Sequence, residues 1–383
     1  MKNKSDLILG IASVGFITQF GGGFASGVQI REFFMNYGVW AFVMPIFAQL
    51  VIALVFGMGL KLAHKHRAFN YREFSDSVFG KFKFILSNLY EIEYVIIVCL
   101  IAGVTFATGT AILGHLFGLD KMTCLAIVGG LMFIMTIFGS DFIMNYSSVI
   151  SVIIIFALAL VLGPAIYSAR DVLFESSLLL VKDFQAADNT AKIMSFMDAL
   201  KAAFIFAMFQ IGTIGFMFPH IRDVSEEKEV KSAMVEMFFI NTLVTELLVV
   251  GMIIATEIGS GSYPTIPILD LAIGQNQTII GKLILLIVFI AAFTTGVNLL
   301  AGVVERFIWL IDRKCNVPAS KSTIFYIMIS LIFVIVAVLI SEIGISNIVS
   351  TGYKYIGYAS IFIVFIPFVV LKFVNKQDNY DRR

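Results

Sequence analysis

The sequence predicts an all-α polytopic membrane protein with ten transmembrane helices in a five-plus-five inverted repeat, in which the first and sixth helices are broken. Hydrophobic residues make up 59% of the 383 residues and charged residues only 14%, whereas a soluble domain averages about 45–50% and about 25%. The apolar residues form runs of roughly twenty or more, which is the length that crosses a bilayer core. Glycine clusters interrupt two of these runs at corresponding places in the two halves.

The predicted spans divide the chain into two repeats joined by an outer loop. The first repeat covers residues 1–170, the loop covers 171–195, and the second repeat with a short cytoplasmic tail covers 196–383. A half-buried turn is expected from Ser346 to Lys354, before the last span. The spans are expected at Leu7–Tyr37, Val39–Leu62, Phe84–Leu113, Met122–Phe138, Phe142–Tyr167, Phe196–Pro219, Ala233–Ile258, Thr278–Ile311, Ser322–Ile343 and Tyr355–Val374.

Positive charge sets the expected orientation. Most of the 27 lysines and arginines fall on one side of the membrane if the N-terminus is placed in the cytoplasm, as the positive-inside rule requires. We therefore expect a multi-pass protein of the bacterial cytoplasmic (inner) membrane, surrounded by the lipid bilayer, with both termini cytoplasmic. The inner loop His64–Phe82 suits an amphipathic surface helix and the outer loop Arg170–Met194 suits a cap, although both are equally compatible with solvated connectors.

The first span is interrupted by four glycines within Gly21–Gly27, each of which costs about 1 kcal/mol of helix stability relative to alanine. Inside hydrocarbon, unwound backbone is tolerated only where it is buried in protein or lines a cavity. The sixth span has a parallel interruption at Gln210–Gly215, followed by Pro219. Matching interruptions in two halves indicate a solute site at the repeat interface, and the alternative is close helix packing through small residues.

A small-solute site needs aromatic walls and a few polar groups, and both breaks offer them. A carboxylate on the third span adds a charged group. The residues expected to form the substrate site are Gly22, Gly23, Phe24, Ser26, Gly27, Glu93, Phe209, Gln210 and Thr213.

The eighth span carries a polar stripe. Its members are spaced so that they share one helix face, and they are Ala291, Thr294, Thr295, Asn298 and Gly302. Oxygens of this kind either bond backbone across a helix interface or coordinate a hard cation. The spacing alone is compatible with both interpretations.

The residues Thr18–Gly27, followed by Arg31–Phe34, resemble the YkvI-type family of bacterial membrane proteins. That family is similar to the amino acid/polyamine/organocation superfamily of transporters, which has the LeuT fold. The resemblance covers nearly the whole chain, and the third and eighth spans are long, as the tilted helices of that fold are. It implies a fold more specifically than it implies a substrate.

The resemblance also implies a sodium site. In sodium-coupled members of the superfamily, one Na⁺ lies between the broken first span and the eighth span. Carried over to this chain, its ligands are the backbone carbonyls of Gly21, Phe24 and Ala291 and the hydroxyls of Thr294 and Thr295. Five hard, neutral oxygens suit a small cation, so Na⁺ is the expected cofactor. A second sodium that uses an asparagine after the break is not expected, since that position is Val28.

Carboxylates at membrane depth are functional hypotheses by default. Glu91 and Glu93 are two residues apart on the third span, so they cannot both face one site, and Glu93 is the candidate for a substrate, proton or gating role. The alternative places both in an inner vestibule near the basic loop. Glu246 lies on the seventh span, where a scaffold role is expected. Arg31 is expected to form an outer-gate ion pair, with Glu32 or Glu342 as its acid.

These features predict a secondary active transporter, a Na⁺-coupled symporter of a small organic solute such as an amino acid or amine, that works by alternating access. The alternative is a membrane-embedded ligand sensor or receptor subunit built on a transporter fold. An enzyme is not expected, because no histidine pair or nucleophile set occurs at membrane depth. A channel would not need two broken helices. The net charge of +1 gives no basis for a nucleic-acid partner, and no obligate protein partner is inferred.

Overall fold

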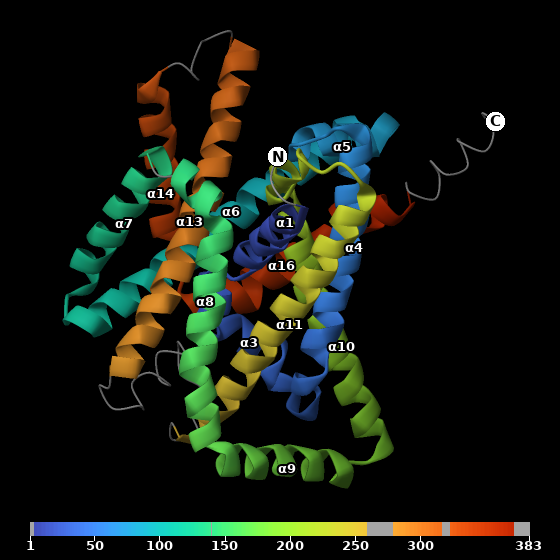
Figure 1. Ribbon diagram of the computed structural model, residues 1–383, viewed down its shortest axis with the longest axis vertical. Helices are drawn as coiled ribbons and strands as arrows, with labels where there is room; N and C mark the ends of the chain where they lie inside the picture. Colours follow the sequence, from blue (N-terminus) through green and yellow to red (C-terminus); the bar gives the residue numbers. More distant parts are fainter. Residues whose placement is uncertain (1–3, 139, 259–278, 316–321, 371–383) are drawn as a thin grey trace, which may run out of the picture.

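The computed structural model describes residues 4–138, 140–258, 279–315 and 322–370. Every regular element in these ranges is a helix, and nine of the helices are long and apolar enough to cross a membrane. The protein is therefore an all-α, multi-pass membrane protein, as predicted. The helices form an elongated bundle, with α9 lying across one end of it (Figure 1).

The first half of the chain begins with a helix in three pieces. The elements are α1 (Lys4–Gln19), α2 (Gly22–Ala25), α3 (Val28–Phe33), the 3₁₀ segment η1 (Met35–Phe42), α4 (Met44–His66), α5 (Tyr71–Phe79), η2 (Gly80–Phe82), α6 (Lys83–Phe117), α7 (Lys121–Phe138) and α8 (Ser140–Ser168). The second predicted span starts later than expected, because Gly38 has a φ of 60° inside η1 and Pro45 starts the regular helix. Proline is favoured in the first turn, where no N–H donor is needed.

The second half repeats the pattern of long spans. Its elements are α9 (Arg170–Ala186), α10 (Asn189–Gly212), the 3₁₀ segments η3 (Thr213–Phe216) and η4 (Phe218–Ile221), α11 (Glu227–Ile258), α13 (Ile279–Cys315), α14 (Thr323–Ser341), α15 (Ile345–Asn347), η6 (Ile348–Tyr353), α16 (Lys354–Ser360) and η7 (Ile361–Phe365). The segments η6 and η7 are π-helical. Thr278 and residues after 370, where two of the spans were expected to start or end, lie outside the described residues.

The segment Ser346–Lys354 differs from the turn that the sequence predicted. It is helical, and the last span runs as one candidate membrane helix from Ile345 to Val370. The turn lies earlier, where Gly344 has a φ of 89°, a conformation that glycine adopts at little cost.

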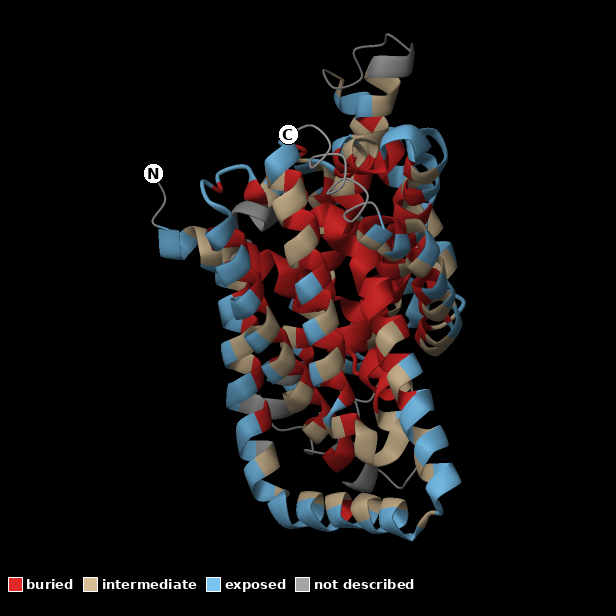
Figure 2. Ribbon diagram, turned by 90° about the vertical axis from the view of Figure 1, so that its right-hand side faces the viewer, coloured by how far each residue is buried: buried red, intermediate tan, exposed pale blue. Residues whose placement is uncertain are grey.

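Two long helices occupy the middle of the bundle. α6 has 35 residues and α13 has 37, and they pack against each other and against α2. Buried residues fill the interior of the bundle, whereas the outer faces of the surrounding helices are exposed (Figure 2). Exposed apolar side chains such as Leu54 and Phe362 mark the faces that meet lipid, as expected where the solvent is hydrocarbon.

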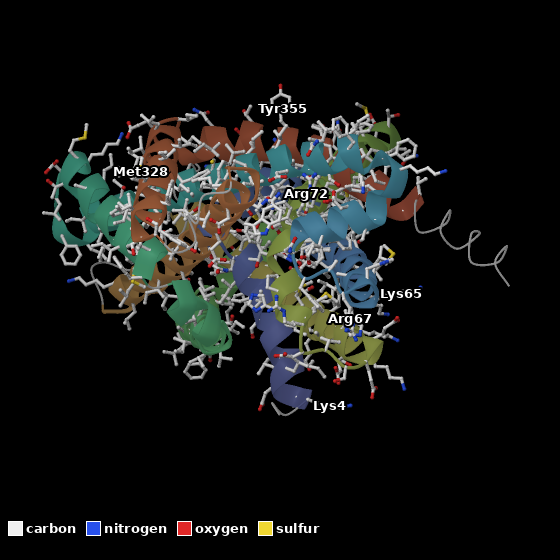
Figure 3. All side chains as sticks on the ribbon, turned by 90° about the horizontal axis from the view of Figure 1, so that it is seen from above. Lys4, Lys65, Arg67, Arg72, Met328 and Tyr355 are labelled. Carbon is white, nitrogen blue, oxygen red and sulfur yellow. The ribbon has the colours of Figure 1, made fainter. Side chains whose placement is uncertain are left out.

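Both long loops are helical, and the inner one, predicted as a surface helix, is buried further than such a helix would be. Its Phe74 ring packs against Phe218 and edge-on against Phe368, so α5 docks into the bundle. Figure 3 shows Lys65, Arg67 and Arg72 where α4 turns into α5. At the other loop, α9 lies against η1 and α11, and Phe184 contacts Trp40.

Candidate functional site

The first break consists of two departures from the helix within seven residues. Gly21 is extended, with φ −75° and ψ −177°, so α1 ends before it. Gly27 has a φ of 84°, a left-handed conformation that costs other residues more than glycine. Between them, α2 is a single turn. The predicted interruption of the first span is therefore confirmed residue by residue.

Neighbouring groups also approach the break closely, most tightly at Gly22, where the neighbour is the backbone of another helix. A Cβ added at Gly22 would lie 2.9 Å from the Cα of Thr105 on α6, and one added at Gly23 would lie 3.0 Å from Nε2 of Gln29. The backbone of the break thus packs directly against the central helix α6. The four-residue α2 is buried.

Hydroxyl side chains of two other helices donate to backbone carbonyls at the first break. The last turn of a helix leaves its carbonyls without intrahelical donors. The Ile17 carbonyl, near the end of α1, accepts the hydroxyl of Thr295 on α13 at 3.1 Å. The Gly22 carbonyl accepts the hydroxyl of Thr108 on α6 at 3.4 Å in addition to the backbone N–H of Ser26. The broken segment is therefore held by α13 on one side and α6 on the other.

The second break is built in the same way. α10 ends at Gly212 and continues as 3₁₀ turns, and the Gly212 carbonyl accepts the hydroxyl of Tyr90 on α6 at 3.3 Å. Thr213 donates its hydroxyl to the Gln210 carbonyl at 2.7 Å. The sixth span is therefore interrupted where the sequence predicted, by a change of helix type.

The residues predicted to bind Na⁺ are brought together in part. Thr294 and Thr295 both donate to the Ala291 carbonyl, at 3.1 and 2.9 Å, and a Cβ added at Gly21 would lie 3.3 Å from Cγ2 of Thr295. The Gly21 carbonyl, however, accepts the N–H groups of Phe24 and Ala25, and the Phe24 carbonyl accepts that of Gly27. The first-span carbonyl that Thr295 reaches is that of Ile17, because α1 ends at Gln19.

The predicted substrate residues lie around the two breaks, and all of those described are buried. Phe209 stacks face to face on Tyr353 of η6 with ring centroids 4.0 Å apart. Phe24 packs against Phe20 and Phe206. Ser26 donates its hydroxyl to the Gly23 carbonyl at 3.1 Å, so it stabilises the unwound turn.

Several polar atoms near the breaks have no hydrogen-bond partner among the described residues. They belong to Gln19, Gln29, Thr105 and Tyr353, and none of these was predicted. Such buried groups cost free energy unless a ligand or water pairs with them. The spacing of Thr105 and Thr108 between two glycines was the only sequence clue to these unpaired groups. The positions of Gln29 and Tyr353 could not be predicted, because they depend on helix orientations that the sequence does not fix.

Glu93 is buried, with 2% of its surface exposed. Its Oε1 accepts the hydroxyl of Ser360 on α16, and its Oε2 has no partner among the described residues. A Cβ added at Gly212 would lie 3.6 Å from Glu93 Oε1, so this carboxyl borders the second break. Glu246 on α11 also has a buried carboxyl oxygen that lacks a partner in the described ranges.

Glu91, in contrast, forms an ion-pair cluster that joins three elements. Its two carboxylate oxygens accept Nε and a terminal nitrogen of Arg306 at 2.8 and 2.9 Å. Two groups of α5 also donate to the Glu91 carboxylate: a terminal nitrogen of Arg72 at 2.7 Å and the Tyr71 hydroxyl at 3.3 Å. This Glu91 cluster links α5, α6 and α13, which fits the vestibule alternative for Glu91.

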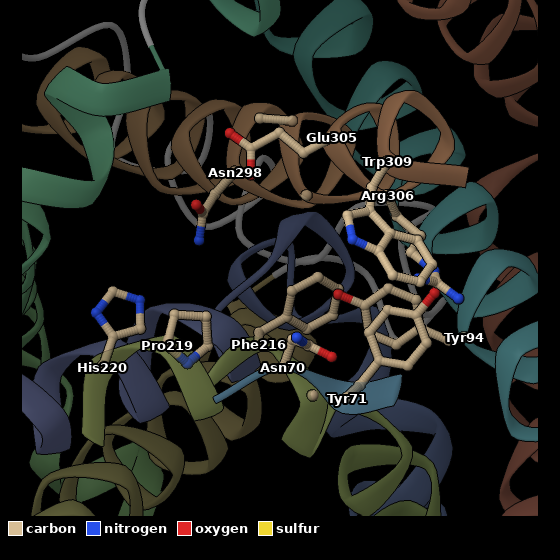
Figure 4. A pocket seen from close by; sticks show the side chains of 13 residues that line it. Asn70, Tyr71, Tyr94, Phe216, Pro219, His220, Asn298, Glu305, Arg306 and Trp309 are labelled. Carbon is tan, nitrogen blue, oxygen red and sulfur yellow. The ribbon is translucent and has the colours of Figure 1, made fainter. Parts of the chain in front are cut away.

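A cavity of about 270 Å³ lies beside the Glu91 cluster. It continues the polar stripe of α13, because Asn298 and Gly302 line it one and two turns after Thr295. In Figure 4 the Asn298 amide points from α13 into the space above Phe216 and Pro219. Its walls are mainly aromatic, from Tyr71, Tyr94, Phe216 and Trp309, with polar groups from Asn70, His220, Glu305 and Arg306.

At the other end of the broken first span, Arg31 forms the expected ion pair with Glu32, at 3.2 Å. Arg31 also donates to the Ser346 hydroxyl at 3.0 Å, and Glu32 lies 3.9 Å from Lys354. These contacts tie α3 to the beginning of the last span. Glu342, the other predicted acid, pairs with Lys121.

Comparisons with known proteins identify the fold. A structure described as a substrate-bound, outward-open Na⁺-coupled sialic acid symporter matches with a TM-score of 0.65 and 14% identity, over 94% of this chain and 78% of that one. The manganese transporter of Eremococcus coleocola, in complex with an aromatic bis-isothiourea compound, matches with a TM-score of 0.61 and 12% identity, over 94% and 78%.

No family model matches the chain, and no curated protein matches it. The resemblance to the YkvI-type family therefore stays a prediction. At 12–14% identity the structural matches carry no substrate or ligand to this chain. They establish that the chain has the fold of these two membrane transporters.

Proposed function

We propose that the protein is a secondary active transporter that moves a small organic solute by alternating access, coupled to Na⁺. The observation that carries this proposal is the shared construction of the two breaks. Each leaves a buried carbonyl that accepts a hydroxyl from a central helix, from Thr295 on α13 at the first break and from Tyr90 on α6 at the second. Interrupted spans placed in this way are typical of transporters that bind their solute at mid-membrane.

The solute would bind between the breaks and α6. Phe209 and Tyr353 supply an aromatic wall, and the amides of Gln19 and Gln29 and the Thr105 hydroxyl supply hydrogen bonds that the protein itself leaves unmade. Aromatic walls with a few convergent polar groups suit an amino acid or amine. The likeness in fold to a Na⁺-coupled symporter supports this class without fixing the substrate.

The coupling ion would bind where α13 meets the end of α1. Thr294, Thr295 and the Ala291 carbonyl supply three oxygens, and the Ile17 carbonyl, already 3.1 Å from the Thr295 hydroxyl, supplies a fourth. Hard, neutral oxygens suit Na⁺. An ion held there bridges the broken span and α13, so it would favour one arrangement of the two.

The cavity beside the Glu91 cluster would be the route between this site and water. Asn298 and Gly302 extend the polar face of α13 from Thr295 into that cavity. Movement of α5 or of η3 would widen or close it, because both contribute to its wall.

Uptake into proteoliposomes tests the proposal. Radiolabelled amino acids and amines are supplied with an inward gradient of NaCl, and with choline chloride at equal ionic strength and pH. Accumulation that depends on Na⁺ and falls in the Thr294→Ala/Thr295→Ala protein supports symport. Equal uptake in both salts, with the double variant unaffected, would rule out the proposed sodium site. Ligand binding without uptake would indicate the sensor alternative.

A further inference from the structure

A second cavity, of about 290 Å³, lies away from both breaks, between the last turns of α6, the first turn of α7 and the end of α14. Small residues on one face of α6 create the space, because Ala107, Ala111 and Gly114 follow one another at helical spacing. At its rim stand Lys121 and Glu342. The solute pathway described above uses none of these residues.

This cavity lies on the lipid-facing side of the bundle. Only 22% of the membrane-crossing part of α7 and 28% of that of α14 is buried, compared with 83% for α10. Figure 1 shows α7 and α14 together at one side of the bundle. An occupant would therefore enter from the bilayer, since that is the medium around these two helices.

The inner wall carries one polar group that the protein does not pair. Thr110 is 8% exposed, lines the cavity, and its Oγ1 has no partner among the described residues. A hydroxyl enclosed by apolar surface loses free energy unless it meets a hydrogen-bond partner. A purely hydrocarbon occupant would leave it unpaired, so an ester or similar oxygen is favoured.

The rim carries one charge of each sign. Lys121 Nζ lies 2.6 Å from a carboxylate oxygen of Glu342, and both side chains are about half exposed. A zwitterionic headgroup complements such a pair, because its phosphate can meet the ammonium group while its own ammonium meets the carboxylate. An anionic headgroup would satisfy the lysine only.

We propose that this cavity binds one glycerophospholipid with a primary-ammonium headgroup, that is, a phosphatidylethanolamine. The headgroup exchanges ion pairs with Lys121 and Glu342. An acyl chain lies along Ala107, Ala111 and Gly114, and the Thr110 hydroxyl donates to an ester oxygen. Such a lipid would fasten α7 and α14 to the central helix α6.

Native mass spectrometry of the purified, delipidated protein tests the proposal. The protein is incubated with phosphatidylethanolamine, phosphatidylcholine or phosphatidylglycerol, and the retained lipid is counted. We expect one retained phosphatidylethanolamine per chain and weaker retention of the other two, because phosphatidylcholine has no N–H donor for Glu342 and phosphatidylglycerol has no cation.

Three variants and one matched control sharpen this test. Thr110→Val and Lys121→Gln should each weaken retention about fivefold through a lost hydrogen bond or ion pair, and Ala111→Phe should abolish it by filling the space. Thr136→Val is the control, because Thr136 on α7 also has a buried hydroxyl without a partner in the described part but does not line this cavity. Retention there should match that of the wild type.

Equal retention of the three lipids, or wild-type retention in both Thr110→Val and Lys121→Gln, would overturn the proposal. If Ala111→Phe fails to fold, the two polar variants decide the outcome. The experiment needs no transported solute, so its result is independent of the proposed transport activity.

Discussion

The Glu91 cluster predicts strong energetic coupling between the inner helix α5 and the central helices. Glu91 accepts two hydrogen bonds from Arg306 and one from Arg72. The exposed fractions of the Glu91, Arg306 and Arg72 side chains are only 18%, 9% and 23%. Glu91→Gln keeps an acceptor oxygen but removes the charge that both guanidinium groups face.

The expected magnitude follows from this burial. Removing one partner of a fully buried pair costs about 3–5 kcal/mol. Because Glu91 is partly exposed and glutamine retains one acceptor, we expect about 2–3 kcal/mol for Glu91→Gln. In a double-mutant cycle with Arg306→Gln, the coupling energy should be about 1–3 kcal/mol.

The assay is unfolding in mixed micelles with an increasing fraction of sodium dodecyl sulfate, followed by circular dichroism. The exposed pair Lys4 and Glu226, 3.4 Å apart with 66% and 57% of their side chains exposed, supplies the matched control cycle, which should show no measurable coupling because solvent screens exposed pairs. A Glu91–Arg306 coupling no larger than that of the control would refute the argument that this cluster holds α5 to α13.

Three further outcomes are expected. Gly23→Leu should abolish ligand binding while the protein still folds, because the added Cβ alone would lie 3.0 Å from Gln29 Nε2; normal binding, measured by thermal shift, would exclude the breaks as the site. Thr295→Val should lower the free energy of unfolding by about 1 kcal/mol through the lost hydrogen bond to the Ile17 carbonyl. It should also raise the Na⁺ concentration needed for half-maximal uptake. An unchanged Na⁺ dependence would show that Thr295 serves only in helix packing. Glu93→Gln should flatten the pH profile of uptake, because the carboxyl beside Ser360 can no longer change charge; a profile identical to that of the wild type would make Glu93 structural.

The helix class and the positions of the breaks could be predicted because they depend on local sequence. Apolar runs specify the spans, and Gly21 and Gly27 adopt backbone conformations that follow from their lack of a side chain. The start of α4 was predicted less well. Its first turn depends on the combination of Gly38 and Pro45, and the apolar run extends across both.

Thr295 was expected beside the first break, but the partners that α6 supplies to the two breaks could not be predicted from the sequence. Thr108 and Tyr90 lie among many polar and aromatic residues of α6, and only the rotation of that helix decides which hydroxyl meets a backbone carbonyl at a break. For the same reason the expected carbonyls of Gly21 and Phe24 differ from the Ile17 carbonyl that Thr295 reaches.

The environments of charged residues were also only partly predictable from the sequence. Helix geometry predicted different environments for Glu91 and Glu93, because side chains two positions apart on a helix point in different directions. Their actual environments depend on α5, α13 and α16, which come from three distant parts of the chain. Arg31 was placed correctly beside Glu32, which follows it directly, whereas Ser346 and Lys354 became its neighbours only through the fold.

The hydroxyl groups that pair with the broken helices have a consequence for synthesis of the protein. Thr295 follows its acceptor Ile17 by 278 residues, and Tyr90 precedes its acceptor Gly212 by 122. At about 5–20 residues per second, roughly 14–56 s separate translation of Ile17 from that of Thr295. During that time the last turn of α1 cannot rest in lipid with the Ile17 carbonyl unpaired. It must stay in a hydrated environment, such as the insertion machinery, until α13 emerges, so the segment that is made first is among the last to reach its final structure.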